Sequence, residues 1–122
     1  APARAELILG IAHEPPLGHF LVLGLGGLHA ELLDSVVLIP VFVSRARLVE
    51  IVESSMAGEL VARVAGGAAH QRLSDVVDSL VALRDLVRAC GDDIASIDIN
   101  PLLVAPMRCT AVDALIVRKS GE

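Results

Sequence analysis

The order of apolar and polar residues divides the first third of the chain into three expected strands. Residues 5–13 are largely apolar and end before Pro15 and Pro16, a turn signal, which predicts a buried strand. Phe20 to Leu25 and Val36 to Phe42 are further short apolar runs, separated by Gly, His and Pro. Such short runs bounded by turn residues favour strands.

A long amphipathic helix is expected over about Gln71 to Ala89. Its apolar residues recur at spacings of three and four, so they form one stripe along the helix. Gly91 suits the C′ position that ends such a helix. The residues of the stripe are Leu73, Val76, Val77, Leu80, Leu83, Val87 and Cys90.

A shorter helix is expected from Arg45 to about Ser55, with Ser44 as its N-cap. Beyond it, Gly58 and the pair Gly66-Gly67 are expected to break the chain on either side of a short apolar piece.

Two segments rich in Val, Ile and Leu, residues 97–104 and 111–117, end the pattern. The four residues between them, 105–108, include a proline, which predicts an antiparallel hairpin. Strands, helices and a closing hairpin together predict an α+β fold, in which helices pack on one face of a largely antiparallel sheet.

Composition and charge narrow the function classes. The chain has 122 residues, enough for one domain, and 54% of them are hydrophobic although Trp and Tyr are absent. This apolar excess suggests a surface covered by another part of a larger protein, so the chain is expected to be a fragment. The net charge of −5 and the lack of a basic run argue against a nucleic-acid partner.

Neither a membrane span nor a disulfide is expected. The longest charge-free stretch, Pro15 to Ala30, has about 16 residues and falls short of the ~20 that cross a bilayer. Cys90 and Cys109 lack CxxC spacing and are interpreted as reduced core residues of a cytoplasmic protein. His13, His19, His29 and His70 show no zinc-site spacing.

Three oxygen-bearing side chains are expected on one face of the hairpin. If Val104 pairs with Cys109, counting four residues outward on each strand places Asn100 opposite Asp113. Asp98 lies two residues before Asn100, and side chains two apart on a strand share a face. Because Mg²⁺ prefers oxygen ligands, the hairpin predicts a magnesium site formed by Asp98, Asn100 and Asp113.

Two alternatives stay open at this point. Polar residues on a strand commonly just face solvent. A slip of one residue in the loop would turn Asn100 and Asp113 onto opposite faces.

The same segments resemble a known family. Asp98 to Leu102 reads Asp-Ile-Asn-Pro-Leu, and Val112 to Ala114 reads Val-Asp-Ala. This pair resembles the C-terminal part of the ATP-grasp module of ADP-forming (NDP-forming) acyl-CoA synthetases and, more distantly, the β subunit of succinyl-CoA synthetase. The resemblance implies that the Asn and the second Asp, here Asn100 and Asp113, hold the Mg²⁺ of a bound nucleotide.

The resemblance extends over nearly the whole chain. Glu6 opens a strand that leads to Gly10, and a Gly-Leu-Gly-Gly stretch over residues 24–27 is followed by Glu31-Leu-Leu. The family places this loop near the active centre, which makes Gly26, Gly27 and Glu31 candidate nucleotide-binding residues. On the residues alone, a tight turn is the competing interpretation, because the GxGxxG fingerprint is absent.

The chain departs from the family pattern at several places. His13 stands where the family has an Arg before Asp-Pro, Leu17 stands for a Phe, and Ser96 stands for a Glu. A Gly-x-Arg-Gly stretch and a following Asp are expected near residues 63–72, and neither the Arg nor the Asp is found at the aligned positions.

The resemblance implies the C-terminal lobe of an ATP-grasp fold, spanning residues 1–122 of a multidomain acid–CoA ligase. Its cofactors would be Mg²⁺ and ATP or ADP, with CoA bound by other domains, and its partners the remaining domains of the same enzyme. The lobe alone is expected to be inactive. Two alternatives are a degenerate ATP-grasp lobe with a structural or regulatory role, favoured by the departures, and an unrelated α+β domain that forms a homo-oligomer.

Overall fold

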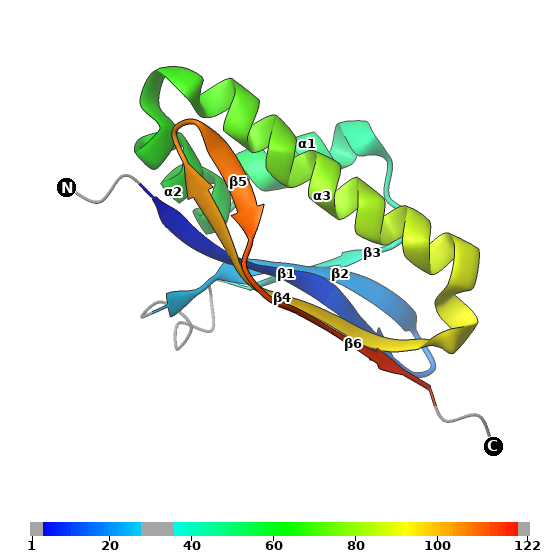
Figure 1. Ribbon diagram of the computed structural model, residues 1–122. Helices are drawn as coiled ribbons and strands as arrows, with labels where there is room; N and C mark the ends of the chain where they lie inside the picture. Colours follow the sequence, from blue (N-terminus) through cyan, green and yellow to red (C-terminus); the bar gives the residue numbers. More distant parts are fainter. Residues whose placement is uncertain (1–3, 28–35, 120–122) are drawn as a thin grey trace.

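The computed structural model describes residues 4–27 and 36–119. A six-stranded antiparallel sheet carries the three α-helices of this part of the chain on one face (Figure 1). The α+β prediction is confirmed. None of the described helices is long and apolar enough to cross a membrane.

The sheet has the order β3-β2-β1-β4, and the last two strands share the remaining side of β4. The three strands expected in the first third are confirmed, although the third is shorter than expected because the chain turns at Val41 and Phe42. The strands are β1 (Ala5–Glu14), β2 (Gly18–Leu25), β3 (Val37–Pro40), β4 (Ile94–Ala105), β5 (Arg108–Ala111) and β6 (Ala114–Arg118).

Alternation along the central strands gives the sheet a buried face and an open face. Leu7, Leu9 and Ile11 of β1 are buried, and they pair with Leu25, Leu23 and Leu21 of β2. These side chains form the core together with one stripe of the long helix. The residues between them lie on the other face, which no described helix covers; this open face is the one on which the polar residues of β4 lie.

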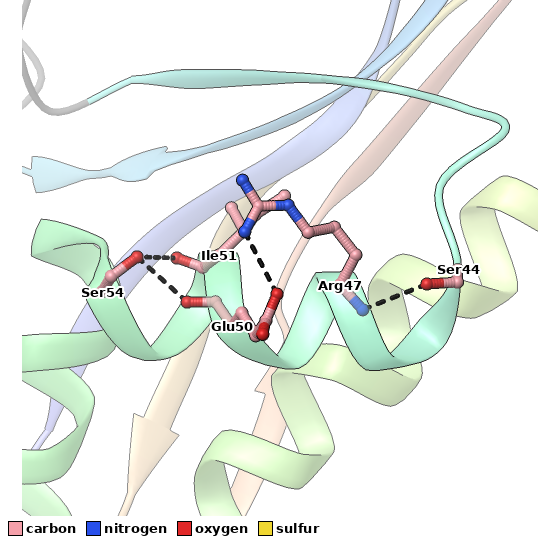
Figure 2. Close-up of polar contacts among 5 residues, drawn as sticks. All are labelled: Ser44, Arg47, Glu50, Ile51 and Ser54. Atoms are coloured by element: carbon pink, nitrogen blue, oxygen red, sulfur yellow. Dashed lines mark hydrogen bonds and ion pairs between the residues drawn. The ribbon is translucent and has the colours of Figure 1, made fainter.

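The helix α1 (Arg45–Ser54) begins at the expected N-cap. Ser44 Oγ accepts a hydrogen bond of 3.1 Å from the backbone N–H of Arg47, as Figure 2 shows. Further along, Arg47 pairs with Glu50 at 3.1 Å. Ser54 Oγ donates to the carbonyls of Glu50 (2.9 Å) and Ile51 (3.2 Å) at the carboxyl end.

The break expected at Gly58 is wrong. Gly58 lies in the first turn of a second helix, α2 (Met56–Ala65), which starts directly after α1. Ser55 ends one helix and caps the next: its Oγ donates to the Val52 carbonyl (2.7 Å) and accepts from the Gly58 N–H (3.0 Å). A Cβ at Gly58 would collide with the Val52 carbonyl oxygen, so glycine permits this close approach.

The long helix α3 (Ala69–Cys90) matches the expected stripe. Val76, Val77, Leu80, Leu83 and Val87 are buried, while Leu73 and Cys90 are half-buried at its two ends. The helix ends at Cys90, so Gly91 directly follows it as expected, although with φ −60° it continues into a 3₁₀ turn, Gly91–Asp93. Gly66, with φ +55°, ends α2.

A polar contact ties the start of α3 to the hairpin loop. The Arg72 guanidinium donates to the Pro106 carbonyl at 2.9 Å. Its Nε lies 2.9 Å from an Asp75 oxygen, an ion pair without hydrogen-bond geometry. Burial raises the pKa of the nearby Cys109 thiol to about 11; the Asp75 carboxylate adds to the rise and Arg72 opposes it.

Replacing Gly58 with alanine tests the helix junction. Helix propensity alone would favour alanine by ~1 kcal/mol, but the collision with Val52 should lower the free energy of unfolding by about 2 kcal/mol or more. Gly67→Ala is the matched control, because a Cβ there meets nothing within 4 Å. Chemical denaturation measures both, and equal stabilities would contradict the close contact.

The reactivity of Cys109 tests the environment at the start of α3. In a Cys90→Ser background, alkylation by iodoacetamide at pH 8 should be about 100-fold slower than for an ordinary thiol, because only the thiolate reacts. Asp75→Asn should lower the Cys109 pKa and speed the reaction, whereas Asp78→Asn, one turn further along the helix, should leave it unchanged. A pH–rate profile that is the same in the parent and in the Asp75→Asn variant would contradict this assignment.

Candidate functional site

The register of the hairpin is the one counted from the sequence. Val104 pairs with Cys109 and Leu102 with Ala111, and the same offset continues through β6, where Ile99 pairs with Ala114. Residues 100 and 113 therefore lie opposite one another. The Asn100 N–H donates to the Asp113 carbonyl at 3.1 Å.

The polar side chains of β4 lie on the open face. Asp98 and Asn100 are exposed, whereas Ile97 is buried against the helices. Asp98 pairs with Gly10 on β1, so no side chain stands beside it there. A Cβ at Gly10 would collide with the Ile97 carbonyl oxygen, so glycine is required at this approach of the two strands.

Asp113 lies at the junction between β5 and β6 and is exposed. One of its carboxylate oxygens accepts a hydrogen bond of 2.9 Å from the next backbone N–H, that of Ala114. This bond holds the carboxylate close to its own backbone and leaves the second oxygen available. Within residues 4–27 and 36–119, neither Asp98 nor Asp113 forms an ion pair with a basic side chain.

A bulge in β4 lies at the centre of this arrangement. The register against β1 shifts between Leu7, which pairs with Leu102, and Leu9, which pairs with Ile99. Asn100 and Pro101, joined by a cis peptide, thus oppose one residue of β1. Because a bulge restarts the alternation, apolar residues on both sides of it can face the helices while Asn100 stays exposed.

The donor set suits a hard cation. Carboxylate and amide oxygens are the ligands that Mg²⁺ takes, and it commonly uses one or two protein carboxylates with waters and substrate phosphates. No three His, Cys, Asp or Glu side chains come together as a metal-binding group in the part of the chain that the structure describes. The predicted ligands are two aspartates and one asparagine, so they would make only a partial shell, which a bound phosphate would complete.

The glycine loop begins beside the start of β1, where it continues the pairing of β2 with β1. The Gly26 N–H donates to the Glu6 carbonyl at 2.8 Å, and Gly27 has φ +60°. A Cβ at Gly27 would lie 3.1 Å from a Glu6 carboxylate oxygen, so the loop passes close to this acid. Glu31, the third residue predicted here, lies outside the described residues.

Sequence reasoning missed a pair of histidines at the end of the β1–β2 hairpin. His13 and His19 pair across the strands and their rings stack, with centroids 4.5 Å apart. The Ile94 carbonyl lies 2.8 Å from His19 Nε2. Desolvation lowers the His13 pKa, and the charges of Lys119 and His19 lower it further. No local sequence pattern indicates this pair, because the two rings meet only through the register between β1 and β2.

Comparisons with known proteins identify the family. The ATP-grasp domain family matches residues 1–117. The ADP-forming acetate–CoA ligase II subunit beta of Pyrococcus furiosus is 32% identical over 126 residues, which cover 97% of this chain and 50% of that protein.

Solved structures give the same relationship. A Pyrococcus horikoshii Ot3 protein superposes with a TM-score of 0.76 at 26% identity, covering 94% of this chain and 48% of its own. The dinucleotide forming acetyl-coenzyme A synthetase 1 of Ca. Korarchaeum cryptofilum, in complex with coenzyme A and Mg-AMPPCP, also has a TM-score of 0.76 at 26% identity, covering 98% and 55%. The chain thus spans about half the length of these relatives.

The family recognised from the Asp-Ile-Asn-Pro-Leu and Val-Asp-Ala segments is therefore confirmed, while the roles of Asp98, Asn100, Asp113, Gly26 and Gly27 stay predictions. The match over residues 1–117 and the shared fold show that this chain belongs to the ATP-grasp domain family and is related to the ADP-forming acyl-CoA synthetases.

Proposed function

We propose that this chain is the magnesium- and nucleotide-binding lobe of an ADP-forming acyl-CoA synthetase, forming the C-terminal half of its ATP-grasp domain. The observation that carries the proposal is the register that sets Asn100 opposite Asp113, with Asp98 on the same strand face as Asn100. A relative that was solved with Mg-AMPPCP shares this fold over 98% of the chain.

Asn100 and Asp113 would hold the metal through the amide oxygen and the free carboxylate oxygen, and Asp98 would bind or orient beside them. A bound Mg²⁺ neutralises charge on phosphate oxygens and fixes their position, which is most of what phosphoryl transfer requires. The aspartates suit this role because, within one copy of the chain, no basic side chain of the described residues forms an ion pair with them.

The open face of the sheet would form one wall of the nucleotide site. Gly10 leaves room beside Asp98, and the half-buried side chains of Ile8 and Val22 provide apolar surface nearby on β1 and β2. An apolar wall next to oxygen ligands fits a molecule that is flat and apolar at one end and charged at the other. Gly26 and Gly27 would lie at the border of this wall.

The whole enzyme would interconvert acyl-CoA, ADP and phosphate with carboxylic acid, CoA and ATP. This chain spans half the length of the Pyrococcus furiosus relative. The other half of the ATP-grasp domain and the CoA-binding and ligase domains would complete the site, so the lobe alone should be inactive. The apolar surface expected from the composition would be covered by these domains.

Alanine substitution of the proposed ligands tests the assignment. In the full-length protein, Asn100→Ala and Asp113→Ala should each lower Mg-ATP-dependent acyl-CoA formation by about 100-fold or more, because the phosphates lose their metal. Asp85→Ala is the matched control: Asp85 is an exposed acid that pairs with Arg84 on α3, the helix that covers the face of the sheet opposite the open face. Activity is measured at saturating acid and CoA.

Magnesium dependence separates a lost ligand from a damaged fold. The Asp113→Ala variant should need more Mg²⁺ for half-maximal rate while its circular dichroism and unfolding midpoint stay those of the parent. Wild-type rates in both ligand variants would refute the metal site. A parent protein without activity, in which the variants bind Mg-nucleotide as it does, would favour the structural lobe instead.

A further inference from the structure

The outer edge of the sheet at β6 carries apolar side chains that nothing in the described structure covers. Only β4 pairs with β6 among the described strands, so the other side of β6 is a free edge (Figure 1, red strand). Leu115, Ile116 and Val117 are 62%, 55% and 43% exposed. Proteins usually protect such edges with lysine, proline or a covering element, because an apolar edge recruits another strand.

The backbone shows which groups of this edge are free. The Asp113 carbonyl accepts from Asn100, and the Lys119 N–H donates to the Asp93 carbonyl at 2.8 Å, so both point inward. Backbone groups alternate in direction along an antiparallel strand. The backbone groups of the residues between them therefore point outward at the even positions, Ala114, Ile116 and Arg118, although the Ala114 N–H already donates to the Asp113 carboxylate at 2.9 Å.

We propose that this edge pairs antiparallel with the same edge of a second copy of the chain, about a two-fold axis at Ile116. In this register Ile116 faces Ile116 of the second copy, and Ala114 faces Arg118 of the second copy. Because the Ala114 N–H stays with the Asp113 carboxylate, the pairing gives about four hydrogen bonds. The self-pairing is isologous, the usual symmetry of dimers.

The side chains are complementary in the same register. Leu115 meets Val117 of the second copy, and Asp113 meets Lys119 of the second copy, each twice by symmetry. A shift of the axis by one residue places either Lys119 against Leu115 or Asp113 against Val117, and it leaves these charges unpaired. The charge pairing thus selects one register, and it favours a second copy over an unrelated strand.

This pairing would join two sheets into one and bring a cation to the proposed metal site. Asp113 and Lys119 of the second copy would share the open face, because odd positions of β6 lie on the same face as Asp98. This last consequence depends on the proposed function, whereas the pairing itself does not. A strand edge alone makes a small interface, so the dimer should be concentration-dependent.

Charged substitutions of Ile116, the residue at the proposed axis, test the proposal. Sedimentation of the full protein over a wide concentration range should show a monomer–dimer equilibrium. Ile116→Lys and Ile116→Glu should each raise the dimer dissociation constant by about tenfold or more, because like charges meet at the axis. An equimolar mixture of the two should restore the dimer. Met107→Lys, on an 84% exposed residue of the hairpin loop, should dimerise as the parent does.

Three outcomes would overturn the proposal, and circular dichroism of each variant verifies the fold. A parent that is monomeric throughout would mean that the edge is bare or covered by another part of the same protein. Dimerisation unchanged by Ile116→Lys would place the interface elsewhere. Failure of the mixture to dimerise would exclude the axis at Ile116. Since sedimentation needs no catalysis, these results are independent of the activity assays.

Discussion

The ladder between β4 and the last two strands is the constraint on which the other features depend. One offset runs from the loop at Ala105 and Arg108 to the pair Ser96 and Val117. It sets Asn100 against Asp113, and it determines which backbone groups of β6 remain free. Because side chains alternate with period two, a different offset by one residue would change the proposed metal site and the edge together.

The sheet and helix layer explain why this ladder is held in place. β4 has β1 on one side, and its buried residues, from Ile97 to Val104, pack on the same core as α3. The apolar stripe of α3 therefore positions the strand that carries the polar residues. The open face can remain polar and accessible because the other face supplies the burial.

Much of the fold could be predicted from the spacing of residues along the sequence. The strands, α1, α3 and the hairpin register follow from local patterns, and Asn100 opposite Asp113 follows from loop length. Gly58 misled because a glycine within a helix and one that ends it look alike in sequence; the close approach of the Val52 carbonyl explains why glycine stands there. The bulge at Asn100 and the stacking of His13 on His19 depend on strand pairing, which no local pattern encodes.

The contact between Arg72 and the Pro106 carbonyl has a mechanical consequence. A hairpin tip that projects beyond its sheet would ordinarily flex about its base. Here one guanidinium anchors the tip to the first turn of the longest described helix, and the opposite end of that helix leads through the 3₁₀ turn Gly91–Asp93 into β4. The helix and the hairpin are thus linked at both ends, so a movement of the hairpin tip away from α3 has to break the Arg72 contact.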